Sequence, residues 1–207
     1  MKEKLLNALK WFYKSFIWLF IVFLGIDILT KQIVMNAGVA PGNVIADWGF
    51  VHISYVLNPN AAFGLGAKDP TVSRIIYLVV ASLISIGIIA YLILKRKTTK
   101  LYIRACLVLV VTGAIGNMID RIFYGPEYAV VDWIDFYWFW GYNFNIADSC
   151  IVVAMFMLII YIIVMEVKDY RAKPKTKIVQ GKQLSKTELE RLEEKNIGEE
   201  KPSEEDK

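Results

Sequence analysis

Residues 146–167 read IADSCIVVAMFMLIIYIIVMEV, a nearly unbroken run of apolar side chains. A helix needs roughly 20 predominantly apolar residues to cross the hydrocarbon core of a bilayer. This run is long enough, and residues 11–29, 75–94 and 105–119 are similarly apolar. The sequence therefore predicts an all-α membrane protein with four transmembrane helices.

The earliest of these runs could instead be a secretory signal peptide, because basic residues precede it. A signal peptide ends in small residues at its cleavage site. Asp27 and Lys31 follow the run where that site would lie. We therefore expect the segment to be retained as the first transmembrane helix.

The composition of the whole chain also favours a membrane protein. Of its 207 residues, 56% are hydrophobic and the mean hydropathy is +0.43, whereas a soluble domain is about 45–50% apolar. The cations lie at the ends of apolar segments, so the net charge of +4 does not indicate nucleic acid binding. One histidine and two cysteines do not make a zinc site, so we expect neither a metal nor a cofactor.

Lysine and arginine in the short connections predict the orientation of the spans. Cations are dense before the first span, between the second and third spans, and after the fourth. They are sparse in residues 32–73 and 123–144. We therefore expect both termini in the cytoplasm, with residues 32–73 and 123–144 outside.

The two outer connections and the C-terminal segment have distinct compositions. Residues 47–57 read as a strand, and residues 123–144 are dense in Trp, Tyr and Phe, which favour the membrane–water interface. We expect a small extracytoplasmic β-structure and an aromatic loop on the outer leaflet. Residues 1–167 would form the membrane domain, and residues 168–207 a charged, mostly disordered cytoplasmic tail.

Ionisable residues gather at the outer ends of the spans, where charge is costly and therefore a candidate for function. Asp27 and Lys31 are four residues apart at the end of the first span, the spacing of an ion pair on one helical face. Asn117, Asp120 and Arg121 lie at the outer end of the third span. Several polar groups are therefore expected at one membrane depth.

Asn145 and Asp148 open the fourth span with the spacing of a helix cap. Capping explains Asn145 but not why Asp120, Asp132, Asp135 and Asp148 should all lie near the outer surface. Two carboxylates held close share a proton, so that one can accept a proton from water while the other polarises a carbonyl. That is the chemistry of aspartic proteases. Spacing alone does not choose which two aspartates pair.

Two other classes of protein remain open on the residues alone. In a small proton-coupled transporter or channel, the acids would be relay groups. Such proteins often have internal repeats or broken helices, neither of which is visible in the sequence. A non-catalytic membrane assembly factor would use the charged tail as its docking segment.

Five short motifs of the sequence, in the order in which they occur, resemble those of a known protein family. They are Asp27-Ile-Leu-Thr-Lys31, Asn58-Pro-Asn-Ala-Ala-Phe-Gly64, Gly113-Ala-Ile-Gly-Asn-Met-Ile-Asp-Arg121, Val130-Val-Asp132 and Phe144-Asn-Ile-Ala-Asp148. Over about residues 15–165 the chain resembles the signal peptidase II family, the lipoprotein signal peptidases of the bacterial inner membrane. The resemblance implies cleavage of diacylglyceryl-modified prolipoproteins just before the lipidated cysteine, with membrane lipids as further partners.

The resemblance also implies a role for each site residue. Asp132 and Asp148 would be the catalytic pair, and Asp120 a helix-end partner. The residues implied to line or support the site are Asp27, Lys31, Asn58, Asn60, Ala61, Phe63, Gly113, Asn117, Asp120, Arg121, Val130, Asn145 and Ala147. Asn60 stands where the family usually has Gly, and because Asn tolerates the left-handed conformation better than most residues, we expect the turn to be kept.

Overall fold

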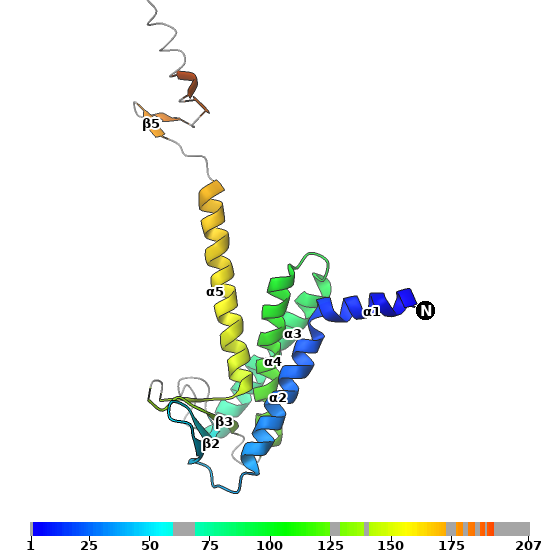
Figure 1. Ribbon diagram of the computed structural model, residues 1–207, viewed down its shortest axis with the longest axis vertical. Helices are drawn as coiled ribbons and strands as arrows, with labels where there is room; N and C mark the ends of the chain where they lie inside the picture. Colours follow the sequence, from blue (N-terminus) through cyan, green and yellow to red (C-terminus); the bar gives the residue numbers. More distant parts are fainter. Residues whose placement is uncertain are drawn as a thin grey trace, which may run out of the picture. The chain divides into compact units, whose positions relative to one another are not determined.

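The computed structural model describes residues 2–59, 69–124, 129–138, 141–172, 177–179, 182–184, 187–188 and 190–192. The chain divides into two compact units, Met1–Ile159 and Ile160–Lys207. Figure 1 shows the order of the elements along the chain. The first unit contains the helices and the sheet that position the site.

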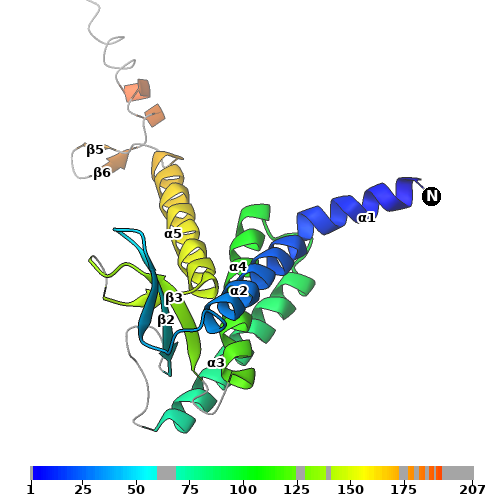
Figure 2. The same ribbon diagram turned by 60° about the horizontal axis from the view of Figure 1, so that its bottom comes forward.

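Four helices are long and apolar enough to cross a membrane, and they confirm the predicted fold class. They are α2 (Ile17–Met35), α3 (Pro70–Leu94), α4 (Leu101–Phe123) and α5 (Ile146–Ala172). Helix α4 packs against both α2 and α3 and is the most buried of the four (Figure 2). The others expose many Ile, Val and Leu side chains, as expected of surfaces that face lipid.

The core of the helices is built from small and medium apolar side chains. Leu109 of α4 and Cys150 and Ala154 of α5 are buried together, and Phe23 of α2 packs against them. Small residues at a helix interface allow the backbones to approach closely. This close approach brings the first turn of α5 next to α2 and α4, where the polar residues lie.

The N-terminal segment differs from the prediction of one span over residues 11–29. Helix α1 (Lys2–Ser15) is separate from α2, and Phe16 between them has a φ of 60°. A left-handed residue cannot continue a right-handed helix. The membrane-crossing helix therefore begins at Ile17 and extends to Met35.

The predicted β-structure is a four-stranded antiparallel sheet in the order β1-β2-β3-β4. Its strands are β1 (Asn43–Asp47), β2 (His52–Asn58), β3 (Val130–Asp135) and β4 (Asn143–Phe144). Residues 47–57 do not form one strand, because a turn at Gly49, whose φ is 85°, separates β1 from β2. The sheet joins residues 32–73 and 123–144, the two connections that are predicted to lie outside.

Aromatic side chains of the second connection pack on the first. The rings of Tyr137 and His52 stack at 3.9 Å, and Trp138 Nε1 donates a hydrogen bond to the carbonyl of Phe50 at 2.7 Å. Residues 125–128 and 139–140 of the predicted aromatic loop lie outside the described residues. The described part of the loop is therefore attached to the hairpin of β1 and β2.

The second unit begins within α5 and continues into the charged segment. Beyond the helix, β5 (Lys177–Val179) pairs antiparallel with β6 (Lys182–Leu184). The mostly disordered tail over residues 168–207, and the division at residue 167, remain predictions.

Candidate active site

Asp132 lies on β3, which packs against α2 and α4, and its side chain is 1% exposed. Its carboxylate oxygens accept hydrogen bonds from the side-chain amides of Asn58 at 2.9 Å and Asn145 at 2.7 Å. Asn58 is the last residue of β2 and pairs with Val130 in the sheet. Strand pairing therefore brings one donor to the carboxylate, and the start of α5 brings the other.

Asp148 lies in the first turn of α5. The side-chain oxygen of Asn145 accepts from the backbone N–H of Asp148 at 2.8 Å, and Asp148 Oδ2 accepts from the backbone N–H of Asn145 at 3.3 Å. This reciprocal arrangement is a capping box, so the predicted helix cap is confirmed. Asp148 Oδ1 accepts from Asn117 Nδ2 at 2.7 Å. The carboxylate is therefore held between α4 and α5.

Asn145 links the two carboxylates in one network. Its amide nitrogen donates to Asp132 and, at 3.1 Å, to Asn117 Oδ1, while its oxygen binds the backbone of Asp148. Its side chain is fully buried. Because each of these groups is fixed by another, the relative position of the two carboxylates is set by the fold.

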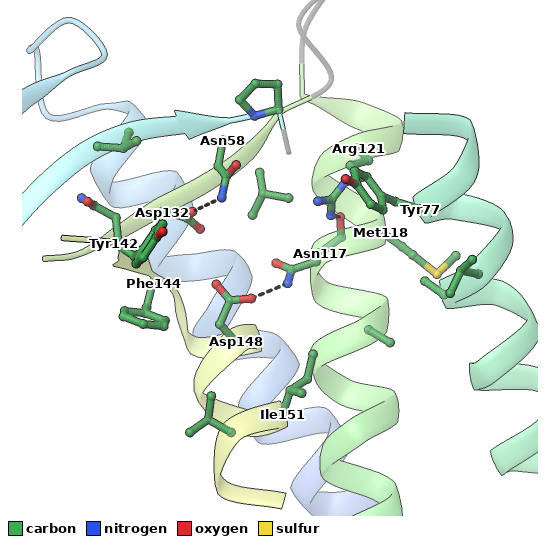
Figure 3. A pocket seen from close by; sticks show the side chains of 18 of the residues that line it. Asn58, Tyr77, Asn117, Met118, Arg121, Asp132, Tyr142, Phe144, Asp148 and Ile151 are labelled. Atoms are coloured by element: carbon green, nitrogen blue, oxygen red, sulfur yellow. Dashed lines mark hydrogen bonds between the residues drawn. The ribbon is translucent and has the colours of Figure 1, made fainter. Parts of the chain in front are cut away.

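Both carboxylates line one cavity of about 660 Å³. Figure 3 shows Asp132 reaching it from the sheet and Asp148 from the start of α5, with Asn58 and Asn117 beside them. Burial and, after it, the negative charge of Asp148 raise the pKa of Asp132 from 3.8 to about 7. The pair can therefore hold one proton near neutral pH.

A buried ion cluster adjoins this network. Lys31 Nζ is 2.8 Å from a carboxylate oxygen of Asp27, 2.8 Å from one of Asp120, and 3.4 Å from Asn117 Oδ1. The side chains of the lysine and both aspartates are at most 1% exposed. The predicted pair of Asp27 with Lys31 is confirmed, and Asp120 is its third member.

The carboxylates of this cluster also hold two backbone positions. Asp120 Oδ2 accepts from the N–H of Val131 at 3.1 Å, and Asp27 Oδ1 accepts from the N–H of Ala147 at 2.8 Å. Val131 and Ala147 directly precede the two aspartates that line the cavity. One buried cluster therefore positions both of them, one through β3 and the other through α5.

Two glycines of α4 permit this close packing. A Cβ at Gly113 would overlap the carbonyl oxygen of Ala147 and lie 2.5 Å from Cγ1 of Ile151. A Cβ at Gly116 would lie 2.8 Å from Oδ2 of Asp27. Gly113 was predicted to support the site, and Gly116, three residues later on the same helical face, was not singled out although its spacing was a usable signal.

Arg121 lies on the other side of the cavity from the paired carboxylates (Figure 3). Its Nη1 donates to the carbonyl of Asn117 at 3.2 Å, and its guanidinium lies 4.9 Å from the centre of the Tyr77 ring. Arg74 Nε donates to the carbonyl of Arg121 at 2.8 Å. Sequence reasoning missed Arg74 and Tyr77. The signal for them was a cation and a phenol near the start of an otherwise apolar span.

The remaining predicted residues fall into two groups. Val130 and Ala147 are buried, and Val130 lines the cavity. Asn60, Ala61 and Phe63 lie outside the described residues.

Comparison with known proteins gives a consistent result. The family model described as signal peptidase (SPase) II matches residues 19–164. A lipoprotein signal peptidase of Clostridioides difficile is 36% identical over 154 residues, which cover 74% of this chain and 98% of that protein. Another, from Desulfitobacterium hafniense, is 35% identical over 158 residues, which cover 76% of this chain and 99% of that protein.

Two solved structures of bacterial membrane enzymes are similar in fold. One has a TM-score of 0.61 and 24% identity, covering 79% of this chain and 93% of its own. The other has a TM-score of 0.59 and 25% identity, covering 70% of this chain and 90% of its own. The fold of this chain is thus similar to that of known bacterial membrane enzymes.

Proposed function

The chain belongs to the signal peptidase II family, and from this premise we propose how it cleaves its substrate and with which residues. It is an aspartic peptidase that removes signal peptides from prolipoproteins. We assign the chemistry to Asp132 and Asp148, and we place the scissile bond just before the cysteine that carries diacylglycerol. These relatives do not favour a transporter or channel.

The observation that carries the assignment is the pair of carboxylates on one cavity, linked through Asn145. A pKa of about 7 at Asp132, raised by burial and by the charge of Asp148, leaves this carboxyl protonated in a large share of molecules at neutral pH. Asp132 is 1% exposed, whereas Asp148 is partly exposed, so that a negative charge costs less hydration at Asp148. Asp132 is therefore our choice for the proton carrier, and Asp148 for the base.

In the proposed reaction, ionised Asp148 takes a proton from water, and the water oxygen attacks the carbonyl carbon of the scissile bond. Protonated Asp132 donates a hydrogen bond to the carbonyl oxygen and stabilises the negative charge that develops on it. The intermediate collapses when Asp148 returns its proton to the amide nitrogen and the C–N bond breaks. One carboxyl and one carboxylate are thereby restored.

The amide groups around the pair serve as neutral positioning groups. Asn58, Asn117 and Asn145 each donate to a carboxylate oxygen of the pair. A cation next to the pair would lower the pKa of the carboxyl groups and so disfavour the proton that they share. These amide donors are uncharged, so they orient the carboxylates without that strong effect. The Lys31 cluster acts from further away, through the backbone of β3 and α5.

The apolar wall of the cavity supports a lipid-modified substrate. It is formed by side chains of α3, α4 and α5, namely Val80, Ala81, Ile84, Val110, Ala114, Val152 and Met155. We place the acyl chains and the apolar signal segment along this wall, with the scissile bond at its polar end. The aromatic second outer connection, of which Tyr142 and Phe144 line the cavity, would then cover the bound substrate and exclude water, as lids do.

The orientation follows from the basic connections. We propose that both termini and the α3–α4 connection face the cytoplasm of a bacterial inner membrane, so that the dyad lies near the outer leaflet. Reporter fusions after Lys97 and after Lys175 should then report the cytoplasm, and a fusion near Asp69 the outer side. A cytoplasmic report at Asp69 would reverse this orientation.

Cleavage of a lipidated preprolipoprotein by purified protein tests the dyad. Asp132→Asn and Asp148→Asn should each lower turnover by about 10²–10⁴-fold or more, because an amide can neither accept nor share the proton. Asp135→Asn is the matched control, since Asp135 lies on the same strand but binds Ser54 at 3.3 Å and does not line the cavity. Near-normal turnover in either dyad variant would refute the assignment.

A further inference from the structure

The chain turns a sharp corner between α1 and α2, so the two helices are not continuous (Figure 1). The left-handed Phe16 breaks the helix. Trp18 Nε1 donates to the carbonyl of Tyr13 at 3.3 Å, and the two rings stack at 6.2 Å with an angle of 4°. Ser15 Oγ donates to the carbonyl of Phe12 at 2.8 Å. Side chains on both sides of Phe16 therefore hold the bend.

The start of α4 fixes the same corner. Arg104 Nη1 donates to the carbonyl of Lys14 at 2.8 Å, and its Nη2 donates to the carbonyl of Arg96 at 2.5 Å. One guanidinium thus ties the end of α1 to the connection between α3 and α4. Because α2 and α4 both cross the membrane, this contact places the end of α1 at the membrane surface that carries the α3–α4 connection.

The two faces of α1 differ in character. Leu5, Leu6, Leu9, Phe12 and Tyr13 recur at the spacing of one helical face. All are exposed, Leu5 by 63% and Leu9 by 56%, and no residue of α1 is buried. Within the described part of the chain, this apolar face is exposed apart from the stacking of Tyr13 on Trp18.

The opposite face of α1 is basic. It carries Lys4, Lys10 and Lys14 around Asn7, together with Glu3 and Trp11. A helix of 14 residues is too short to cross a bilayer. A short helix with a leucine and aromatic face and a lysine face suits the boundary between acyl chains and anionic headgroups.

We propose that α1 is an interfacial helix that lies along one membrane surface, with Leu5, Leu9 and Phe12 among the acyl chains and its lysines on anionic lipid headgroups. In the orientation proposed above, this surface is the cytoplasmic leaflet. The family match begins at residue 19, so α1 lies outside the matched segment. The lipid contact is separate from the cleavage chemistry and does not depend on it.

Depth measurements on the full chain test this inference. Nitroxide labels at Leu9→Cys and Asn7→Cys probe opposite faces, and Leu5→Cys with Glu3→Cys form a second pair. The native Cys106 and Cys150 are buried and remain unlabelled. The protein is placed at one copy per nanodisc of phosphatidylglycerol and phosphatidylcholine. Collisions with oxygen report the acyl region, and collisions with a nickel chelate report water.

The expected result is opposite accessibility within each pair, with oxygen favoured at Leu9 and Leu5, and nickel favoured at Asn7 and Glu3. Replacing phosphatidylglycerol with phosphatidylcholine should reduce the contrast. The ratio of membrane-bound to free α1 should fall by roughly fivefold for each lysine that loses its anionic partner. Water exposure of all four labels would overturn the proposal. So would a contrast that appears only with two copies per disc, which would indicate a contact between chains.

Discussion

Charged side chains are buried at one end of the helices in the first unit and exposed at the other end. At the end that adjoins the sheet, Asp27, Lys31 and Asp120 are almost fully buried and pair with one another. At the end where α3 leads into α4, Lys95 and Lys97 are exposed. One end therefore uses charge inside the protein, and the other presents it at the surface.

This difference indicates what each set of charges can do. A buried ion requires partners at fixed positions, so the cluster around Lys31 determines where β3 and α5 begin relative to each other. An exposed cation stays hydrated and contributes little to stability, although the proposed orientation of the spans rests on such cations. Substitutions should therefore affect folding and cleavage strongly at the first end and weakly at the second.

We expect Lys31→Met to have the largest effect of the substitutions that distinguish the two ends. It leaves Asp27 and Asp120 buried without their cation, and breaking a buried pair in this way costs about 3–5 kcal/mol. Thermal unfolding in detergent should shift to a clearly lower temperature. Cleavage should be lost because Asp120 and Asp27 would no longer hold the backbone N–H groups of Val131 and Ala147 in place.

The matched control is Lys97→Met at the opposite end. Lys97 is exposed, so its replacement should change stability by no more than about 0.5 kcal/mol. Equal unfolding temperatures for the two variants would remove the distinction between buried and exposed charge.

Gly113→Ala should have the next largest effect. The added Cβ would overlap the carbonyl oxygen of Ala147, and overpacking of this kind costs about 1–3 kcal/mol. Because the first turn of α5 would have to shift, Asp148 would be displaced, and a displacement near 1 Å lowers turnover by about 100-fold. The cleavage assay and thermal unfolding measure both effects.

Gly87→Ala in α3 provides the comparison. No atom lies within 4 Å of the Cβ that it would add, and alanine favours a helix over glycine by about 1 kcal/mol. Turnover should be unchanged. If Gly113→Ala also cleaved at the wild-type rate, the close approach of α4 and α5 would not position the dyad.

Truncation after Lys177 should have the smallest effect. The removed segment contains none of the five motifs and lies beyond residue 164, where the family match ends. The shortened protein keeps Lys168, Arg171, Lys173, Lys175 and Lys177, which can hold the end of α5 at an anionic surface. Its turnover should equal that of the full chain.

The position of the cut provides the control. A truncation before Lys168 should instead impair insertion or stability, because α5 extends to Ala172. Lost turnover in the shorter truncation, with expression unchanged, would assign the tail a role in cleavage.

Local patterns in the sequence were sufficient for several features of this fold. Hydropathy predicts four spans because each transmembrane helix must be apolar on its own. The i,i+4 spacing of Asp27 and Lys31 predicts their ion pair, and the spacing of Asn145 and Asp148 predicts the cap. Each of these interactions lies within one helix or at its end.

Other features depend on how distant segments pack. Asp120 joins Lys31 from another helix, which no spacing along the chain encodes. Phe16 adopts a left-handed conformation that is uncommon for a bulky residue, so the corner before α2 was not predictable. One usable signal was overlooked: residues three apart on a strand face opposite sides, which separates Asp132 from Asp135.

The dependence of kcat/KM on pH tests the central claim most directly, because it reports the essential acid and base of the free enzyme. Folding raises the pKa of Asp132 to about 7 through burial and the charge of Asp148, so this carboxyl is protonated below that pH and loses its proton as the pH rises. A shared-proton pair therefore predicts a bell-shaped profile in which cleavage declines on the alkaline side from about pH 7. A rate that keeps rising or stays level up to pH 9 would contradict a protonated Asp132 as the catalytic acid.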